Sequence, residues 1–240
     1  PTSGAVFVFE RNRQQYVLAD ADDQGRHTFT RTYYDNLDQV VKSERYYDVA
    51  GDGVDADSDP NPDDRLLARS ESFYDDRGRT YLTKTYAVDP STGAVGSALC
   101  GYTWYDAAGH PIKQQAAGSK SFTKTVYDSL GRAVKQYTGY DLSEPLPAAP
   151  SSSSSSSSSA ADTYTPATTV TGDTILEQSE TAYDAAGNVT LSTTRRRFHN
   201  ATGTGELTSP AGAQPKARVS YVAFYADPIG WVLHEDIPVT

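Results

Sequence analysis

The 240-residue sequence has no methionine and a single cysteine, Cys100. One cysteine cannot form an internal disulfide bond, so no disulfide framework holds this chain together. The sequence also lacks any run of about 18 apolar residues, which excludes a membrane-spanning helix. Because the chain begins at Pro1 and has no methionine, we expect it to be cut from a longer precursor, so the missing signal peptide says little about its compartment.

Hydrophobic residues are also scarce, at 37%, and the net charge is -10. These two values alone would indicate disorder. The 17 tyrosines favour order instead, since a tyrosine ring packs on a half-buried pleated surface while its hydroxyl stays in water. We therefore expect an ordered β protein with a thin aromatic core. The excess of acidic over basic residues, 31 against 21, argues against a nucleic-acid partner.

Motifs of catalysis are missing as well. The four histidines, His27, His110, His199 and His234, are scattered without the spacing of a metal site. The sequence contains no phosphate-binding glycine loop, no nucleophile elbow and no zinc-protease motif. We therefore expect no enzyme activity.

What the sequence has in abundance is a tyrosine–aspartate pair. It occurs at Tyr34, Tyr47, Tyr74, Tyr105, Tyr127, Tyr140 and Tyr183, with looser copies at Tyr86 and Tyr225. In four copies a glycine follows three residues after the aspartate, and then Arg, His or Asn. The residues of these four copies are Tyr74, Asp75 and Gly78; Tyr105, Asp106 and Gly109; Tyr127, Asp128 and Gly131; and Tyr183, Asp184 and Gly187.

Each copy is predicted to be a strand, a tight turn and a second strand. The flanking segments, such as 121–127 and 188–194, are rich in β-branched and aromatic residues. The aspartate is expected to accept a backbone hydrogen bond two residues further on, and the glycine to adopt a positive φ. Successive hairpins predict an all-β fold, a continuous antiparallel sheet that is curled or coiled.

The units Tyr74–Arg79 and Tyr127–Arg132, with the variants Tyr105–His110 and Tyr183–Asn188, make the chain resemble the YD-repeat or RHS-repeat family. The resemblance covers nearly the whole chain apart from 142–172. In that family the repeats form a long β-sheet that coils into a hollow shell, as in bacterial toxin complexes and secretion effectors. The resemblance implies a β-sheet scaffold.

Three segments are predicted along the chain. Residues 1–141 and 173–240 form two blocks of YD-repeat sheet, and residues 142–172 form a loop or linker of low complexity. The middle segment contains nine consecutive serines, Ser151–Ser159, with prolines around them. Such a tract is typical of a flexible or extended linker, and O-linked glycosylation is the alternative.

An acidic loop over 48–64 is the other insertion. It places aspartates at nearly every second position, and Ca²⁺ prefers oxygen ligands of this kind. The candidate calcium ligands are Asp52, Asp55, Asp57, Asp59 and Asp63. The loop is not an EF-hand, because Pro60 and Leu66 stand where that motif needs Gly and Glu. The alternative is a solvated acidic loop without a metal.

The sequence thus predicts a structural part of a secreted or cell-surface bacterial assembly: a shell strip, a stalk or a filament subunit. Its expected partners are further copies of itself or the rest of a larger repeat protein. The alternatives are a shell segment of an RHS-type toxin, and an extracellular adhesin or carbohydrate-binding module that uses exposed tyrosines with Trp104 and Trp231.

Overall fold

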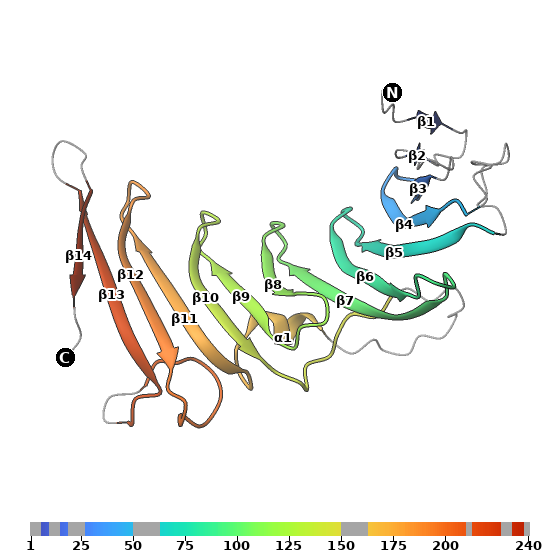
Figure 1. Cartoon of the computed structure of the whole chain (residues 1–240). Helices are drawn as coiled ribbons and strands as arrows, with labels where there is room; N and C mark the ends of the chain where they lie inside the picture. The colour runs from blue at the N-terminus through green and yellow to red at the C-terminus, as the bar shows by residue number, and fades with distance from the viewer. Residues whose placement is uncertain are drawn as a thin grey trace. The chain divides into compact units, whose positions relative to one another are not determined.

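The computed structural model describes residues 27–49, 63–149, 163–209 and 213–224, together with the backbone of 225–226 and of the strand segments 6–9, 15–18 and 232–237. Fourteen strands lie in one sheet in the order in which they occur in the sequence (Figure 1). They are β1 (Val6–Phe9), β2 (Gln15–Leu18), β3 (Thr28–Tyr34), β4 (Val40–Tyr47), β5 (Arg65–Tyr74), β6 (Thr80–Val88), β7 (Val95–Tyr105), β8 (Pro111–Gln115), β9 (Phe122–Tyr127), β10 (Ala133–Tyr140), β11 (Thr174–Tyr183), β12 (Val189–Arg197), β13 (Ala217–Ala226) and β14 (Val232–Ile237).

Neighbouring strands pair antiparallel, as in β9 with β10 and β11 with β12. The predicted all-β class built from tandem hairpins is therefore confirmed. One short helix, α1 (Tyr164–Thr168), is the exception. Within the part of the chain that the structure describes, no helix has the length and apolar character needed to cross a bilayer.

The connections between strands are of two kinds. The strands β3, β5, β7, β9 and β11 each end in a tyrosine, and a tight turn beginning with aspartate follows each of them. The even-numbered strands lead into connections of varied length, including the acidic loop after β4 and the 33 residues, 141–173, between β10 and β11. All insertions in this part of the sheet therefore emerge at the strand ends opposite the tight turns.

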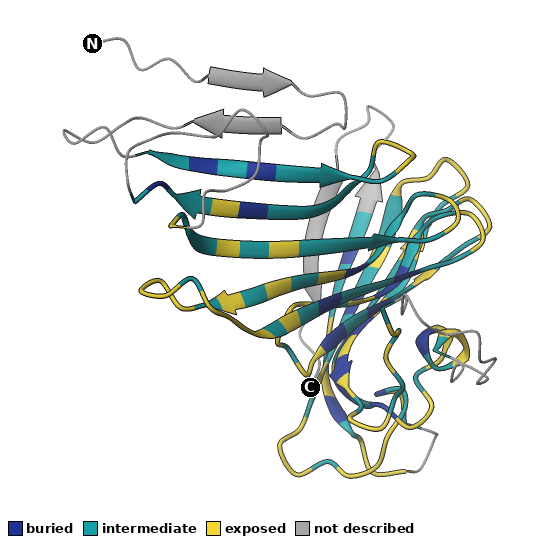
Figure 2. Ribbon diagram, turned by 90° about the vertical axis from the view of Figure 1, so that its right-hand side faces the viewer, coloured by how far each residue is buried: buried dark blue, intermediate teal, exposed yellow. Residues whose placement is uncertain are grey.

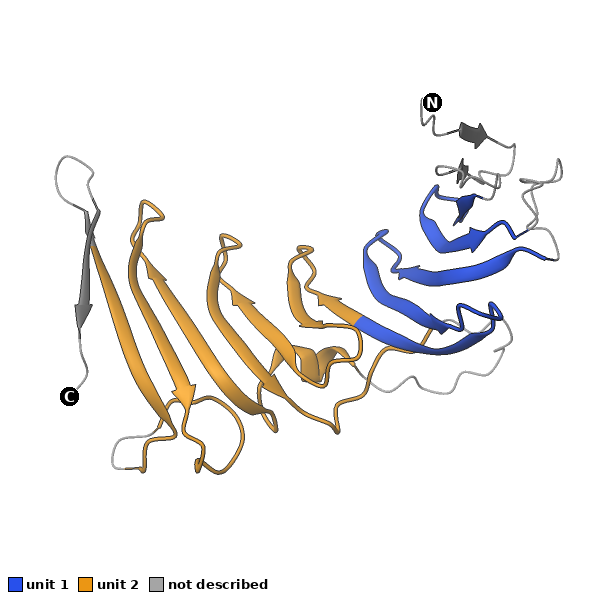
Figure 3. Ribbon diagram, in the orientation of Figure 1, with its two compact units in different colours: residues 1–101 blue, residues 102–240 orange. Residues whose placement is uncertain are grey.

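The chain divides into two compact units, residues 1–101 and 102–240, with the boundary inside β7 (Figure 3). Each unit has buried residues of its own. The expected division into repeat blocks 1–141 and 173–240 with a linker over 142–172 stays a prediction, and the serine tract of that linker lies outside the described residues.

The first unit has a thin core that is made of both aromatic and polar side chains. Phe29 is buried and stacks on Tyr46 with ring centroids 5.3 Å apart. The buried carboxylate of Glu44 accepts hydrogen bonds from the hydroxyls of Tyr33 and Tyr46, at 2.9 and 3.0 Å. Burial and this carboxylate raise the pKa of both tyrosines, so both hydroxyls stay protonated donors.

The second unit has two small apolar clusters. One contains Phe122, Tyr137, Ile175, Leu207 and Ala217, and the other contains Trp104, Ile112 and Ala167. Figure 2 shows that buried residues are separated along the strands by half-buried and exposed ones. A sheet of this kind has little apolar surface to bury, so the hydrogen bonds and ion pairs between its strands matter more than usual.

Candidate functional site: the turn ties and the buried row

The tight turns are closed by their aspartates. In the turn after β5, Asp75 Oδ1 accepts the backbone N–H groups of Arg77 and Arg79, each at 2.9 Å. Its Oδ2 accepts Nε of Arg79 at 2.7 Å, and the Gly78 N–H donates to the Asp75 carbonyl oxygen at 2.9 Å. The bond from the backbone four residues on recurs at Asp35, Asp106, Asp128 and Asp184. The carboxylate thus serves as the hydrogen-bond acceptor of its own turn.

These bonds favour the ionised carboxylate. At Asp128, the backbone and side-chain hydrogen bonds from Arg132 lower the pKa. At Asp184, the side-chain and backbone bonds from Asn188 lower the pKa in the same way. Hydrogen bonds within each of these turns therefore stabilise the ionised form of the aspartate, and the ionised aspartate stabilises the turn.

The glycine of each turn has the backbone conformation that the turn needs. Gly131 has a φ of +77°, which residues with a side chain rarely adopt. A Cβ at this position would also lie 2.9 Å from Nε2 of His110, a residue of the preceding turn. In the turn after β3, Asp38 stands at the glycine position with a φ of +63°. Aspartate tolerates this conformation better than most residues.

The tyrosines of three motifs each form a hydrogen bond to the preceding hairpin. Tyr74 Oη donates to the carbonyl oxygen of Val40 at 2.8 Å. Tyr127 Oη donates to Pro111 at 3.2 Å, and Tyr183 Oη donates to Ala133 at 3.1 Å. In all three cases the acceptor lies two residues after the glycine position of the preceding turn. We call these three hydrogen bonds the turn ties.

In two turns, the residue that follows the glycine packs on the tyrosine of the next hairpin. The ring of His110 stacks on Tyr127 with centroids 4.7 Å apart. The guanidinium of Arg132 lies 4.4 Å from the ring centroid of Tyr183. Both contacts use the aromatic face while the hydroxyl makes the turn tie, so the motifs of Tyr127 and Tyr183 each contact the preceding hairpin twice.

A second feature is a row of buried side chains that crosses the second unit. The register places Trp104 opposite Lys113, Lys113 opposite Lys124, Lys124 opposite Tyr137, and Tyr137 opposite Gln178. All five side chains are buried, with Lys113 and Lys124 only 2% and 3% exposed. Residues directly opposite one another share a face of the sheet. We call these five residues the buried row.

The buried row is covered by the connection between β10 and β11. We call its described parts, residues 141–149 and 163–173, the strap. Its helix α1 packs on β8 and β9, and Ala167 is buried against Trp104 and Ile112. A segment predicted to be a loop or linker thus contributes a side chain to the core of the second unit.

The strap also supplies the counter-charges of the two lysines. Nζ of Lys124 lies 2.6 Å from Glu144 and 2.6 Å from Asp173. It also donates to the carbonyl oxygens of Pro166 and Thr169, at 2.8 and 2.7 Å. The Lys113 ammonium pairs with the other oxygen of Glu144. The lysines therefore hold the strap at both of its ends.

Burial affects the ionisation of this cluster. It lowers the pKa of Lys113, against the influence of Glu144. It raises the pKa of Asp173 to about 6, although the bond from Lys124 acts in the opposite direction. Both ammonium groups also face aromatic rings: Lys113 lies 4.6 Å from the ring centroids of Trp104 and Phe122, and Lys124 lies 4.6 Å from that of Phe122.

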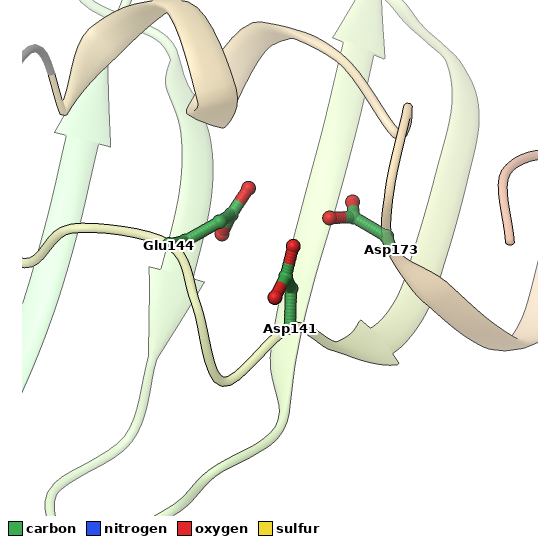
Figure 4. A group of neighbouring side chains, drawn as sticks. All are labelled: Asp141, Glu144 and Asp173. Atoms are coloured by element: carbon green, nitrogen blue, oxygen red, sulfur yellow. The ribbon is translucent and has the colours of Figure 1, made fainter.

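Three carboxylates of the strap lie together. Oxygens of Asp141, Glu144 and Asp173 lie within 4.8 Å of one another, and Figure 4 shows the three side chains pointing toward one another. The cationic partners of Glu144 and Asp173 are the two lysines, which already lie at hydrogen-bond distance. The arrangement is that of a buried ion-pair cluster, and we assign no metal to it.

A second loop, residues 198–209, covers the far end of the row. Glu206 accepts the hydroxyl of Tyr137 at 2.6 Å, and the Leu207 N–H donates to the side chain of Gln178 at 2.7 Å. The Gly205 N–H donates to the Asp173 carbonyl oxygen at 2.8 Å, which joins this loop to the strap. Lys113, Lys124, Tyr137 and the side-chain oxygen of Gln178 thus find partners in the two loops that cover the row. The buried Nε1 of Trp104 has no hydrogen-bond partner among the described residues.

The residues predicted from the sequence fall in different places. The candidate calcium ligands Asp52, Asp55, Asp57 and Asp59 lie outside the described residues, and Asp63 is exposed. The calcium site stays a prediction. The alternative of an adhesin or carbohydrate-binding module required an exposed Trp104, and this is wrong, because its side chain is 5% exposed and packs against Ala167 of α1. Trp231 lies outside the described residues.

The buried row and its carboxylates were not predicted. A signal was present in β9, where Phe122 and Lys124 are two residues apart and therefore share a face of the strand. A lysine on the same face as a buried phenylalanine needs a counter-charge, and the sequence does not show where that charge comes from.

Comparisons with known proteins give no family. No protein-family model matches the chain, and no curated protein gives a significant match. Among solved structures, a chain of the Photorhabdus luminescens Tc holotoxin pore is 14% identical over 95% of this chain, with a TM-score of 0.27. A chain of the TcdB2–TccC3–TEV crystal structure is 13% identical over 95%, also with a TM-score of 0.27. This chain spans 13% of the length of each. At these values the likeness carries no argument about function.

Proposed function

We propose that this chain is a non-catalytic structural segment of a larger secreted or cell-surface bacterial assembly, in which its sheet continues through further hairpins of the same kind. The observation that carries the proposal is the turn tie. Three times along the chain, a motif tyrosine bonds the carbonyl oxygen at the same position of the preceding turn.

Because the turn ties join successive hairpins, the motif allows one hairpin after another to be added to the sheet. In each of the three turn ties, one hairpin provides a carbonyl oxygen and the next hairpin provides a tyrosine hydroxyl. The aspartate and the glycine of the motif close the turn itself. Because these groups are engaged in holding hairpins in sequence, the motif supports an array and does not present a reactive group.

The ends of the sheet support the same proposal. Among the strands that the structure describes, β1 pairs with β2 alone and β14 pairs with β13 alone. An edge strand has unpaired backbone N–H and C=O groups, and these pair readily with another strand. We therefore propose that the partners are strands of further YD hairpins, from the same polypeptide or from another copy.

Finer versions of the proposal differ in how the strands continue. A shell strip or a segment of an RHS-type toxin continues into hairpins of its own polypeptide, whereas a filament subunit pairs with other copies. The acidic balance of the chain, 31 Asp and Glu against 21 Lys and Arg, supports a solvated surface.

Light scattering and electron microscopy of the purified chain over a range of concentrations test the proposal. We expect concentration-dependent rows of copies. Association should weaken in a His234→Pro variant, because proline in β14 removes a backbone donor from an edge strand. The matched control is Ser129→Pro, at a turn position where proline is well tolerated. Monomers alone at the highest concentration, or equal association in both variants, would contradict pairing through this edge.

A further inference from the structure

The charges beneath the strap do not balance. The carboxylates of Asp141, Glu144 and Asp173 lie within 4.8 Å of one another. Two ammonium groups, those of Lys113 and Lys124, pair with this group. If every group is ionised, one negative charge is in excess. Asp141 and Glu144 are partly buried, whereas Asp173 is completely buried beside the nearly buried Lys113 and Lys124. An uncompensated charge in such surroundings is costly.

The excess negative charge is best assigned to the carboxylate of Asp173. Asp173 is completely buried, and its Oδ2 accepts Lys124 at 2.6 Å. Its Oδ1 is also buried and has no hydrogen-bond partner among the residues that the structure describes. A buried carboxylate oxygen without a partner is uncommon in proteins. The side chain points toward Asp141 and Glu144 (Figure 4).

Asp173 is held in place by its backbone as well. Its N–H donates to the carbonyl oxygen of Val170 at 3.1 Å, and its carbonyl oxygen accepts the Gly205 N–H at 2.8 Å. These bonds fix the backbone of Asp173, and its side chain is completely buried, so it reaches solvent only if the strap or the neighbouring loop moves. A change in the charge of Asp173 thus changes the free energy with which the strap is held on the sheet.

We propose that the strap is a latch that tightens when Asp173 takes up a proton. The proton comes from solvent and binds Oδ1, and no covalent bond breaks. The new O–H donates toward the neighbouring carboxylates, which gives the orphaned oxygen a partner. Two ammonium groups then face two carboxylates, and the charges under the strap are balanced.

The surrounding groups fix the sign of this effect. Asp173 is faced by Lys124 on β9, Lys113 on β8, and Glu144 and Asp141 on the strap itself. Burial raises the pKa of Asp173 to about 6 from an ordinary value of 3.8. A carboxyl group whose pKa is higher in the seated strap than in the released strap binds its proton more tightly in the seated form. Acidification from pH 8 to pH 5 therefore holds the strap more firmly.

Hydrogen exchange across this pH range tests the latch. The amides of Thr169 and Asp173 donate within the strap, to Pro166 and Val170. Their protection factors, corrected for the intrinsic exchange rate at each pH, should rise about tenfold between pH 8 and pH 5. In Asp173→Asn this pH dependence should disappear, since an amide does not titrate here. In Glu177→Gln, which removes an exposed pair with Arg196, the dependence should remain.

A direct titration keeps the test decisive if Asp173→Asn does not fold. The ¹³C shift of the Asp173 carboxyl group in the unmodified chain should titrate near pH 6. A midpoint at or below pH 4, or protection that is flat or falls toward pH 5, would overturn the proposal. It would also be overturned if millimolar Ca²⁺ at pH 8 raised the protection as much as acidification does, because the missing charge would then belong to a metal ion.

Discussion

Lys113 and Lys124 lie directly opposite one another on β8 and β9, and their ammonium groups pair with the two oxygens of the same carboxylate, Glu144. Like charges in opposite positions destabilise a sheet. Here the counter-charge comes from the strap, 31 residues beyond Lys113 and 20 beyond Lys124. An insertion in the repeat array is thereby fixed to the face of the sheet.

Loss of the Glu144 charge should release the strap. In Glu144→Gln, Lys113 loses its carboxylate partner, and Lys124 keeps Asp173 as its one carboxylate partner among the described residues. Breaking one partner of a buried pair costs about 3–5 kcal/mol. With Trp231→Phe as background, Trp104 becomes the only tryptophan. Its fluorescence should become more accessible to acrylamide quenching.

The matched control for that variant is Glu177→Gln. Glu177 pairs with Arg196 at 3.1 Å, and both side chains are exposed. Loss of such a pair changes stability by less than about 1 kcal/mol. Trp104 quenching should therefore stay unchanged, and equal quenching in the two variants would show that the strap is not held by charge.

The turns should make the chain sensitive to acid. Burial opposes ionisation of Asp75, but the hydrogen bonds from Arg79 outweigh it and lower the pKa. A carboxyl group whose pKa is lower in the folded chain stabilises the fold at every pH above its pKa in the unfolded chain, which is 3.8. This stabilisation is lost as the pH falls through the pKa of the folded chain. The urea midpoint should therefore fall between pH 5 and pH 2, and fall less in Asp75→Asn.

Asp76→Asn is the control for that experiment, since Asp76 is the exposed neighbour of Asp75 in the same turn. In Asp76→Asn the urea midpoint should fall between pH 5 and pH 2 as much as in the unmodified chain. If the midpoint fell equally in Asp75→Asn and Asp76→Asn, the Asp75 carboxylate would not be the cause of the acid sensitivity.

Gly131→Ala tests the spacing between neighbouring turns. A residue with a side chain at this positive φ costs about 1–2 kcal/mol. The new Cβ would add a clash with His110, at 2.9 Å from its Nε2. Chemical denaturation should therefore show a larger loss than in Gly203→Ala, where φ is +80° and a Cβ would have no atom within 4 Å.

The clash itself can be isolated by a second substitution. In a His110→Ala background, Gly131→Ala should cost only the backbone part, as Gly203→Ala does. An unchanged cost in that background would mean that His110 moves aside freely.

The hairpins could be predicted from the sequence because their information is local. Aspartate and glycine at fixed spacing determine a turn without help from distant residues. Asp75 and Gly78 therefore predict a hairpin, and the strands beside them have the β-branched and aromatic residues of a pleated surface.

The strap could not be predicted, because its contacts join residues that are far apart. Lys124 looks like an ordinary strand residue, and Asp173 lies 49 positions further on, beyond the serine tract. Composition indicates a linker for 142–172 and gives no sign that Ala167 enters the core. The same contact buries Trp104, and because the sequence does not reveal that contact, nothing in it ruled out an exposed Trp104.

The central claim is that the motif tyrosines tie each hairpin to the one before it. The most direct test is the free energy of unfolding of Tyr74→Phe and Tyr127→Phe, measured by urea denaturation beside Tyr140→Phe. The first two variants lose hydrogen bonds of 2.8 and 3.2 Å to Val40 and Pro111, whereas Tyr140 is an exposed tyrosine at the opposite end of its hairpin. We predict losses of about 1 kcal/mol for Tyr74→Phe and Tyr127→Phe, and less than about 0.5 kcal/mol for Tyr140→Phe. Equal and negligible losses in all three would contradict the claim.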